Sequence, residues 1–261
     1  MPKKILWIFL ANTLIANELR IESITIQSYP IEYYVGGKNE PYFLFLSGLG
    51  VDKNSMLILA KTLIQKYPYR ALLPDIPGQG RTKRIPEQNY SIEFLADFFH
   101  TMLKEIKPRK KVILVGNSMG GHIATVFALK YHEQVDSLIL INPAGIEFEN
   151  QKPYQLLPDE LIINEKNPKV IDDFRWNNKI RKDIQSCRYY ILNPYLKEVK
   201  VHTFLFWGTQ DKNIPYSYSQ VWASEIPDIL FFVLPGGHLL QNDQPEKIWE
   251  KFFLYWRKNQ F

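Results

Sequence analysis

The chain holds one serine whose immediate neighbours suit it for nucleophilic chemistry. Ser118 is the centre of G-N-S-M-G at 116–120, directly after the apolar segment 111–115 and directly before a helical pattern at 121–131. Glycines beside a serine let an incoming strand and an outgoing helix approach closely, and the strained turn between them exposes the hydroxyl. A helix N-terminus also favours the negative charge that develops in acyl transfer. The pattern therefore predicts a nucleophile at Ser118.

Two later residues could activate this hydroxyl. A serine needs a base to take its proton, and the base needs a carboxylate to hold its tautomer. His238 follows the last predicted strand in L-P-G-G-H, and Asp211 follows the predicted strand at 201–207. Each alone would be typical of a loop or a turn, but the order Ser, Asp, His, with each residue after a strand, predicts a triad. The rival position for the acid holds Asn142, which cannot carry the charge.

A third requirement is a pair of backbone N–H groups for the oxyanion. We expect one from Met119, directly after the nucleophile, and the other from Leu49 in the loop S-G-L-G at 47–50. A glycine-rich turn without a catalytic role is the alternative for this loop. Asp243 also lies near His238, but its spacing from Glu246 is that of a capping box at a helix start.

The elements that must position these residues alternate along the chain. Segments rich in β-branched and aromatic residues alternate with helical patterns, which predicts an α/β fold with a mostly parallel sheet and helices on both faces. Turn residues at 36–39 predict that the chain opens with antiparallel strands. Helices are expected from Ser91 to Ile106 and after Asp243. The eight predicted strands are 21–27, 31–35, 41–46, 70–73, 111–115, 137–142, 201–207 and 230–234.

Length and composition predict one domain. The 261 residues are 46% hydrophobic, which is enough for one substantial core, and the domain is expected at 20–261. The segment 145–199 is too long for a plain crossover and carries Phe174, Trp176, Tyr189 and Tyr190. We interpret it as an inserted, mostly helical cap over the carboxyl ends of the strands, where ligands bind in open α/β sheets.

Charge and cysteine content exclude several classes of protein. The net charge of +5 comes from dispersed basic residues, so nucleic-acid binding is not expected. Cys187 is the single cysteine, which excludes an intramolecular disulfide and a cysteine-based metal cluster. The five histidines lack the spacing typical of a zinc site. The chemistry predicted for Ser118 requires no metal and no cofactor.

The N-terminus has a pattern of its own. A basic start at Lys3 and Lys4 precedes an apolar run, and Ala16 could precede a cleavage point, although Leu14 occupies a position that favours a small residue. The run is too short for a comfortable membrane span. We expect 1–19 to be a signal peptide or a membrane-anchoring segment, which places the protein outside the cytoplasm or at a membrane surface. The alternative is an extra strand or helix of a cytoplasmic protein.

Further motifs complete a resemblance to a known family. D-I-P-G-Q-G at 75–80 and N-P-A-G at 142–145, together with the serine motif and the chain order, make the sequence similar to the α/β-hydrolase superfamily. Within it, N-P-A-G and an apolar N-terminus resemble monoacylglycerol-lipase-like serine esterases. Such members usually read H-G where this chain has Ser47 and Gly48. The resemblance implies an eight-stranded sheet with an inserted cap.

Three functions stay open at this point. The first is hydrolysis of a carboxylic ester, such as a small-molecule ester or a monoacylglycerol, through an acyl-enzyme on Ser118. The second is hydrolysis of carbon-carbon bonds in ring-fission products, but such relatives place Trp after the catalytic histidine, where this chain has Leu239. The third is a non-catalytic ligand-binding homologue. Relatives that use Asp as nucleophile are disfavoured by Ser118. The sequence does not define the oligomeric state.

Overall fold

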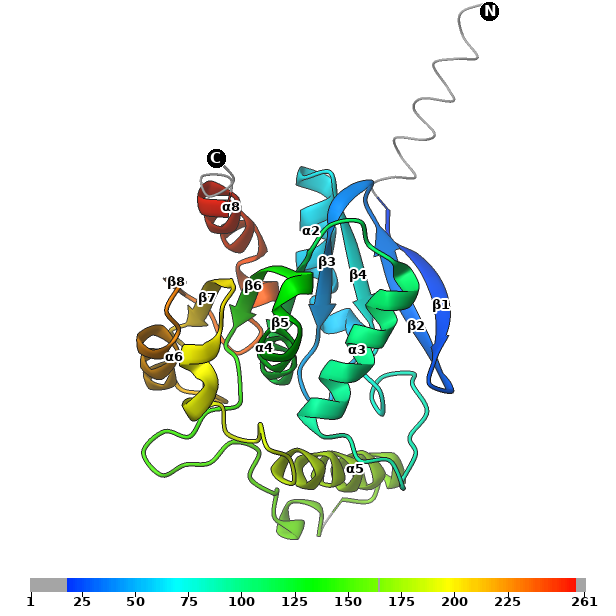
Figure 1. The fold of residues 1–261 in the computed structure, drawn as a ribbon. Helices are drawn as coiled ribbons and strands as arrows, with labels where there is room; N and C mark the ends of the chain where they lie inside the picture. The colour runs from blue at the N-terminus through cyan, green and yellow to red at the C-terminus, as the bar shows by residue number, and fades with distance from the viewer. Residues whose placement is uncertain (1–17, 164, 257–261) are drawn as a thin grey trace, which may run out of the picture.

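The structure, a computed structural model, describes residues 18–163 and 165–256. All but the last two residues of the predicted signal-like segment 1–19 lie outside these described residues. Within them, a central sheet is covered by helices on both faces (Figure 1). No helix in this part of the chain is long and apolar enough to cross a membrane.

Eight strands form the sheet, and each predicted strand range overlaps one of them. The spatial order is β1-β2-β4-β3-β5-β6-β7-β8. Strand β2 is antiparallel to both of its neighbours and the other pairs are parallel, which confirms the antiparallel opening. The strands are β1 (Arg20–Ile26), β2 (Tyr29–Gly36), β3 (Asn39–Leu46), β4 (Tyr69–Pro74), β5 (Val112–Asn117), β6 (Val135–Ile141), β7 (His202–Gly208) and β8 (Ile229–Leu234).

Alternation along the strands divides the core into two layers. Leu44 and Leu46 of β3 belong to a cluster on one face, and Phe43 and Phe45 belong to a cluster on the other, as the period of two in a strand requires. Helices α3 (Ile92–Ile106), α4 (Met119–Tyr131) and α6 (Ser219–Glu225) contribute to the first cluster. Helices α2 (Leu57–Lys66), α7 (Leu240–Asp243) and α8 (Pro245–Trp256) contribute to the second. Both faces of the sheet are thus buried.

The start of helix α8 differs from the sequence-based expectation. A capping box was predicted at Asp243 and Glu246, but α8 begins at Pro245, and Asp243 ends the separate helix α7. The Asp243 carboxylate instead accepts a 2.8 Å hydrogen bond from the backbone N–H of Gly237. The capping-box prediction is wrong because Gln244, not Asp243, directly precedes the first helical residue, a position where proline is common.

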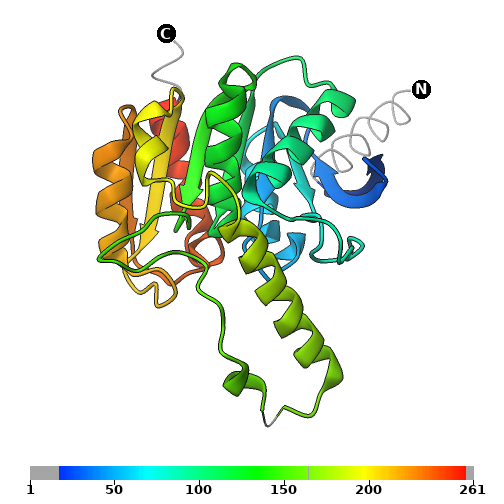
Figure 2. The same ribbon diagram turned by 60° about the horizontal axis from the view of Figure 1, so that its bottom comes forward.

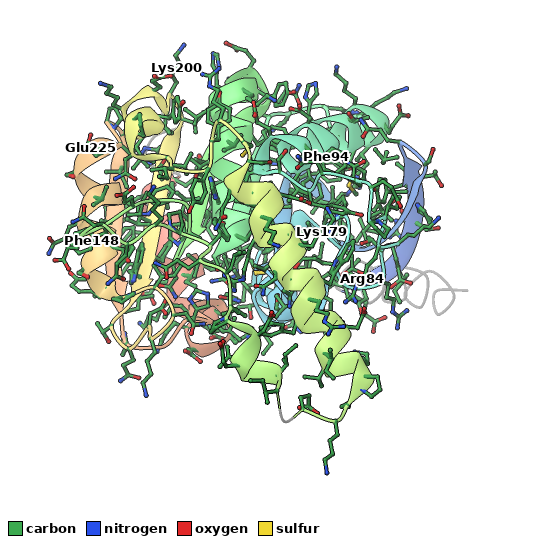
Figure 3. The ribbon with its side chains drawn as sticks, turned by 90° about the horizontal axis from the view of Figure 1, so that it is seen from below. Arg84, Phe94, Phe148, Lys179, Lys200 and Glu225 are labelled. Carbon is green, nitrogen blue, oxygen red and sulfur yellow. The ribbon has the colours of Figure 1, made fainter. Side chains whose placement is uncertain are left out.

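The segment between β6 and β7 crosses the edge where the parallel strands end (Figure 2). It contains the long helix α5 (Pro168–Gln185) and the 3-10 helices η3 (Asp159–Ile162) and η4 (Asn193–Glu198). Side chains tie α5 to the loop after β4, since Trp176 Nε1 donates to Gly78 O at 2.6 Å and Arg84 pairs with Asp172 (Figure 3). The remaining 3-10 helices are η1 (Lys53–Met56), η2 (His132–Gln134) and η5 (Tyr216–Tyr218).

The two ends of this segment meet at one point, which we call the neck. The backbone N–H of Leu192 donates to Gly145 O at 2.7 Å. The Asn193 carboxamide exchanges two hydrogen bonds with the backbone of Glu147, at 2.8 and 2.9 Å. We call residues 148–191, between the two sides of the neck, the insertion. The chain therefore leaves the sheet and returns to it through the neck.

Candidate active site

Ser118 lies on a sharp turn between β5 and α4. Its backbone has φ 55° and ψ −120°, a strained combination for a residue with a side chain. A Cβ at Gly116 would approach Gly120 O to 2.3 Å, and a Cβ at Gly120 would approach Leu46 O to 2.0 Å. Only glycine fits at either position, so the G-x-S-x-G spacing is a steric requirement of this turn.

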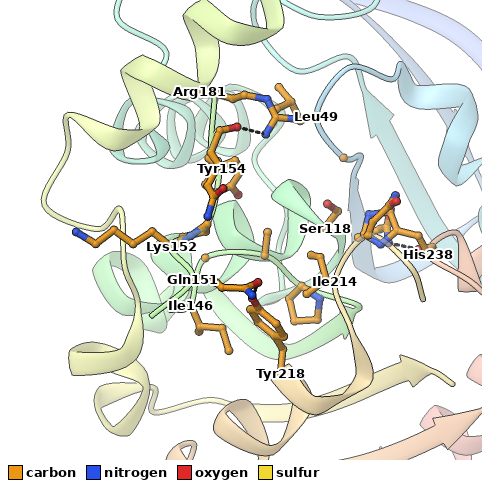
Figure 4. A pocket seen from close by; sticks show the side chains of 18 of the residues that line it. Leu49, Ser118, Ile146, Gln151, Lys152, Tyr154, Arg181, Ile214, Tyr218 and His238 are labelled. Atoms are coloured by element: carbon orange, nitrogen blue, oxygen red, sulfur yellow. Dashed lines mark hydrogen bonds between the residues drawn. The ribbon is translucent and has the colours of Figure 1, made fainter. Parts of the chain in front are cut away.

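Asp211 and His238 are brought together from the loops after β7 and β8. His238 Nδ1 lies 2.8 Å from Asp211 Oδ2, and the Asp211 side chain is fully buried. The other carboxylate oxygen, Oδ1, accepts hydrogen bonds from the backbone N–H groups of Asn213 and Ile214 at 2.8 and 2.9 Å. A carboxylate acceptor at Nδ1 selects the tautomer that leaves Nε2 as the basic nitrogen. Ser118 and His238 line the same pocket (Figure 4).

Three carboxamides hold the loop of His238 in place. The Asn142 Nδ2 donates to the backbone oxygens of Gly237 and His238 at 2.9 and 3.0 Å, while its Oδ1 accepts from Gly208 N at 2.8 Å. The Asn117 Nδ2 also donates to His238 O, at 3.0 Å. Gln241 Nε2 in turn lies 3.4 Å from Asn117 Oδ1. The residue next to Ser118 is therefore linked directly to the backbone of His238.

Sequence reasoning missed this role of Asn142 and Asn117. From the sequence, Asn142 was interpreted only as the residue that occupies the rival position for the catalytic acid. Asn142 has φ 44° and is fully buried directly after a strand, and a buried carboxamide needs several hydrogen-bond partners. The sequence signal was an asparagine at the end of a strand, but its partners lie 95 and 96 positions later in the chain.

The loop after β3 lies against Ser118. A Cβ at Gly48 would be 3.3 Å from Ser118 Cβ, and Gly50 N donates a 2.5 Å hydrogen bond to Gln79 Oε1. In the described part of the chain, no protein acceptor is recorded for the backbone N–H of Leu49 or of Met119. Both expected oxyanion donors therefore have unused N–H groups. Gln79 belongs to the D-I-P-G-Q-G motif, so that motif supports this loop.

A pocket of about 660 Å³ opens above Ser118. One side of it is the sheet edge, with Ser118 and His238, and the other comes from the insertion, including Gln151, Lys152 and Tyr154 (Figure 4). The apolar side chains that line it include those of Leu49, Val51, Ile146, Leu157, Ile214 and Leu239. This volume and mixed lining suit a small organic ligand.

His122 connects the helix after Ser118 to the insertion. It is fully buried, with Nδ1 at 3.0 Å from the Tyr154 hydroxyl and Nε2 at 2.7 Å from Tyr189 O. Burial lowers the pKa of His122 to about 4, against the smaller opposing effect of the Tyr189 carbonyl. The imidazole is therefore neutral at pH 7 and positions Tyr154, which lines the pocket.

Asp75, the first residue of D-I-P-G-Q-G, has a structural role. It is fully buried and accepts hydrogen bonds from Lys53 N at 2.9 Å and from Lys53 Nζ at 2.7 Å. Lys53 Nζ also lies 2.8 Å from Glu32 Oε1. A Cβ at Gly80 would approach the Asp75 carboxylate to 2.4 Å, which explains the last glycine of the motif. This buried ion pair joins β2, β4 and η1.

The fold is that of a hydrolase family. The family profile described as "alpha/beta hydrolase fold" matches residues 41–177, just over half of the chain. The chain belongs to the α/β-hydrolase family.

In residues 18–163 and 165–256, no group of three or more His, Cys, Asp or Glu side chains could hold a metal ion.

Curated relatives of this chain include two kinds of hydrolase. Monoacylglycerol lipase ABHD6 of Mus musculus is 25% identical over 262 aligned residues, which cover 85% of this chain and 77% of the relative. The 2-hydroxy-6-oxo-6-phenylhexa-2,4-dienoate hydrolase of Burkholderia cepacia is 26% identical, with 66% of this chain and 72% of the relative covered. The relatives support a hydrolase of esters or related substrates.

Solved structures show the same fold. A membrane phospholipase A described as a bacterial virulence factor has a TM-score of 0.79 at 23% identity, and the match covers 98% of this chain and 92% of that one. The meta-cleavage product hydrolase CumD has a TM-score of 0.72, also at 23% identity, with 91% and 98% covered. At this identity the likeness establishes the fold alone.

Proposed function

We propose that the protein is a serine hydrolase of carboxylic esters, with Ser118 as nucleophile, His238 as general base and Asp211 as the carboxylate that orients it. The observation that carries this proposal is the 2.8 Å contact between His238 Nδ1 and buried Asp211, at the pocket that Ser118 lines. The strained backbone of Ser118 supports the same assignment, since strain of this kind persists where function needs it.

The reaction has two steps. In the first, His238 Nε2 takes the proton of Ser118 Oγ as that oxygen attacks the ester carbonyl, and the proton then passes to the departing alcohol oxygen. The N–H groups of Leu49 and Met119 stabilise the oxyanion of each tetrahedral intermediate. In the second, His238 deprotonates a water molecule that attacks the acyl-enzyme, and the carboxylic acid leaves as Ser118 regains its proton. Asp211 stays ionised throughout.

The pocket supports a substrate with an apolar part, such as a lipid ester. Leu49, Ile214 and Leu239 lie in its wall, and its volume is large enough for more than the reacting group. The relative named as a monoacylglycerol lipase supports the same substrate class. Hydrolysis of carbon-carbon bonds is the second candidate, favoured by the relative that acts on a phenylhexadienoate. Leu239 after His238 favours the ester.

We also propose that 1–19 directs the protein to a membrane surface or out of the cytoplasm. The support is the basic start and the apolar run of the sequence. Sequencing the N-terminus of the mature protein from its native cell tests cleavage. An uncleaved chain in the soluble cytoplasmic fraction contradicts the proposal.

Covalent labelling and an ester series test the enzyme assignment. A fluorophosphonate should label the wild type, whereas Ser118→Ala should stay unlabelled. On p-nitrophenyl esters of increasing acyl length, Ser118→Ala should lose more than about 10⁴-fold in kcat, and Asp211→Asn about 10³- to 10⁴-fold. Equal hydrolysis by wild type and Ser118→Ala contradicts the assignment. Absence of labelling in folded wild-type protein favours the ligand-binding alternative.

A further inference from the structure

A positive charge faces the pocket from the insertion. Arg181 projects from α5, and its Nη1 donates a 3.1 Å hydrogen bond to Gln155 O. Its Nε is buried and has no hydrogen-bond partner in the described part of the chain. Burial lowers the pKa of the guanidinium, with a smaller opposing effect of Tyr154, but arginine stays protonated in proteins. Arg181 is therefore a half-buried cation with one unpaired donor.

The wall of the pocket carries no negative charge to balance this cation. No Asp or Glu is among the residues that line the pocket, whereas Arg181 and Lys152 both line it. Between residues 18 and 256, with 164 left out, neither Arg181 nor Lys152 forms an ion pair with a carboxylate. An unpaired buried charge lowers stability. Its presence at a pocket is explained if the counter-charge comes from a ligand.

The position of α5 places this charge close to the reaction site. Asn177, one helical turn before Arg181, lies over the loop that carries Leu49, since a Cβ at Gly50 would be 3.1 Å from Asn177 Nδ2. Arg181 reaches from α5 in the direction of Leu49 (Figure 4). The guanidinium therefore faces the same space as the proposed oxyanion donors, although it belongs to a different part of the fold.

We propose that Arg181 binds an anionic group of the ester substrate, a carboxylate or a phosphate that is separate from the reacting carbonyl. This inference rests on the proposed ester hydrolysis and adds the charge class of the substrate. A guanidinium suits either anion because its planar donors match two oxygens at once.

Two pairs of substrates distinguish the sources of the anion. For a carboxylate on the acyl part, p-nitrophenyl half-esters of succinic, adipic and suberic acids are compared with p-nitrophenyl esters of monocarboxylic acids of equal length. For a phosphate on the alcohol part, 1-acylglycerol 3-phosphate is compared with the monoacylglycerol of the same chain. Wild type should prefer the anionic member of at least one pair by about 10- to 100-fold in kcat/KM.

Variants of Arg181 test whether this residue causes the preference. Arg181→Gln should abolish it while changing kcat/KM for the neutral esters by less than about twofold, and Arg181→Lys should keep part of it. The matched control is Arg175→Gln, which removes an exposed arginine from the same helix and should leave the preference intact. The inference is overturned if wild type shows no preference in either pair, or if Arg181→Gln slows both members equally.

A binding measurement separates this inference from the proposed function. Octyl phosphate and octanol are titrated against Ser118→Ala protein, with and without Arg181→Gln, and intrinsic fluorescence reports binding. Arg181→Gln should weaken octyl phosphate binding by about tenfold or more and leave octanol binding unchanged. Equal affinity for octyl phosphate in both proteins contradicts the anion subsite. Missing turnover together with an unlabelled Ser118 contradicts the ester hydrolase instead.

Discussion

Two cations in this molecule have opposite surroundings. Lys53, at the start of η1, is buried against the carboxylates of Asp75 and Glu32, at 2.7 and 2.8 Å. Arg181, on α5, is buried at its Nε but contacts no carboxylate in the described part of the chain. The first charge is neutralised within the fold. The second, on Arg181, is the one that we propose an anionic group of the substrate neutralises.

The contrast extends to the neutral polar groups around the pocket. Both ring nitrogens of His122 have partners, and so do both ends of the Asn142 carboxamide. These residues hold other parts of the site in place, and their hydrogen bonds are complete without a ligand. Complete pairing suits side chains that support the structure, whereas Arg181, in the pocket wall, has an Nε without a partner in the described part of the chain. Three predictions test this distinction.

The largest expected effect is on Lys53. Lys53→Met should lower the free energy of unfolding by about 3–5 kcal/mol, because it leaves the buried Asp75 carboxylate without its cation. Arg181→Met should change the free energy of unfolding by about 1 kcal/mol or less, since no carboxylate loses a partner. Urea unfolding followed by fluorescence gives both values. Similar losses of the free energy of unfolding in Lys53→Met and Arg181→Met would contradict the contrast between the two cations.

A smaller effect, dependent on pH, is expected at His122. Its pKa is about 4 in the folded protein and about 6.5 when unfolded, so the unfolded chain binds the extra proton between these values. The contribution of neutral His122 to the free energy of unfolding is therefore complete above pH 6.5. It falls by about 3 kcal/mol as the pH drops to 4. Urea unfolding from pH 7 to 4 should show a steeper loss for wild type than for His122→Gln. Parallel curves would contradict a neutral His122.

The smallest change in stability is expected at Asn142. Asn142→Ala removes the partner of Gly208 N and of Gly237 O, while His238 O keeps its hydrogen bond from Asn117, and this should lower the free energy of unfolding by about 1–3 kcal/mol. Because the loop carries the proposed base, kcat should fall by about tenfold while KM changes little. Ser224→Ala, at an exposed site on α6, is the control. Unchanged kcat in Asn142→Ala would show that the loop needs no such support.

The fold was predictable where local pattern and short motifs decide it. Runs of β-branched residues predicted all eight described strands, and the sterics of Gly116 and Gly120 explain why a five-residue motif located the turn at Ser118. The approach of Asp211 to His238 followed from chain order, because parallel strands end at one edge.

Other parts of the site were not predictable because their partners lie far away in the chain. The roles of His122 and Asn142 depend on backbone groups brought close only by tertiary packing. Arg181 lies in a polar helix whose sequence has no strong apolar stripe, so nothing local indicated which of its charges faces inward. The capping-box spacing of Asp243 was misleading for a different reason, because its carboxylate accepts a hydrogen bond from Gly237 N, six residues earlier, instead of capping α8.

The neck at Gly145 and Leu192 lets the two halves of the pocket diverge at different rates during evolution. Since the chain leaves and returns at one hydrogen-bonded point, insertions, deletions or replacements beyond it change the loop between β6 and β7 at a small entropic cost. Ala144, just before the neck, donates its N–H to Ser118 O at 3.0 Å. A descendant of this chain could therefore acquire a new wall, with a new charge and shape, and keep the same reaction.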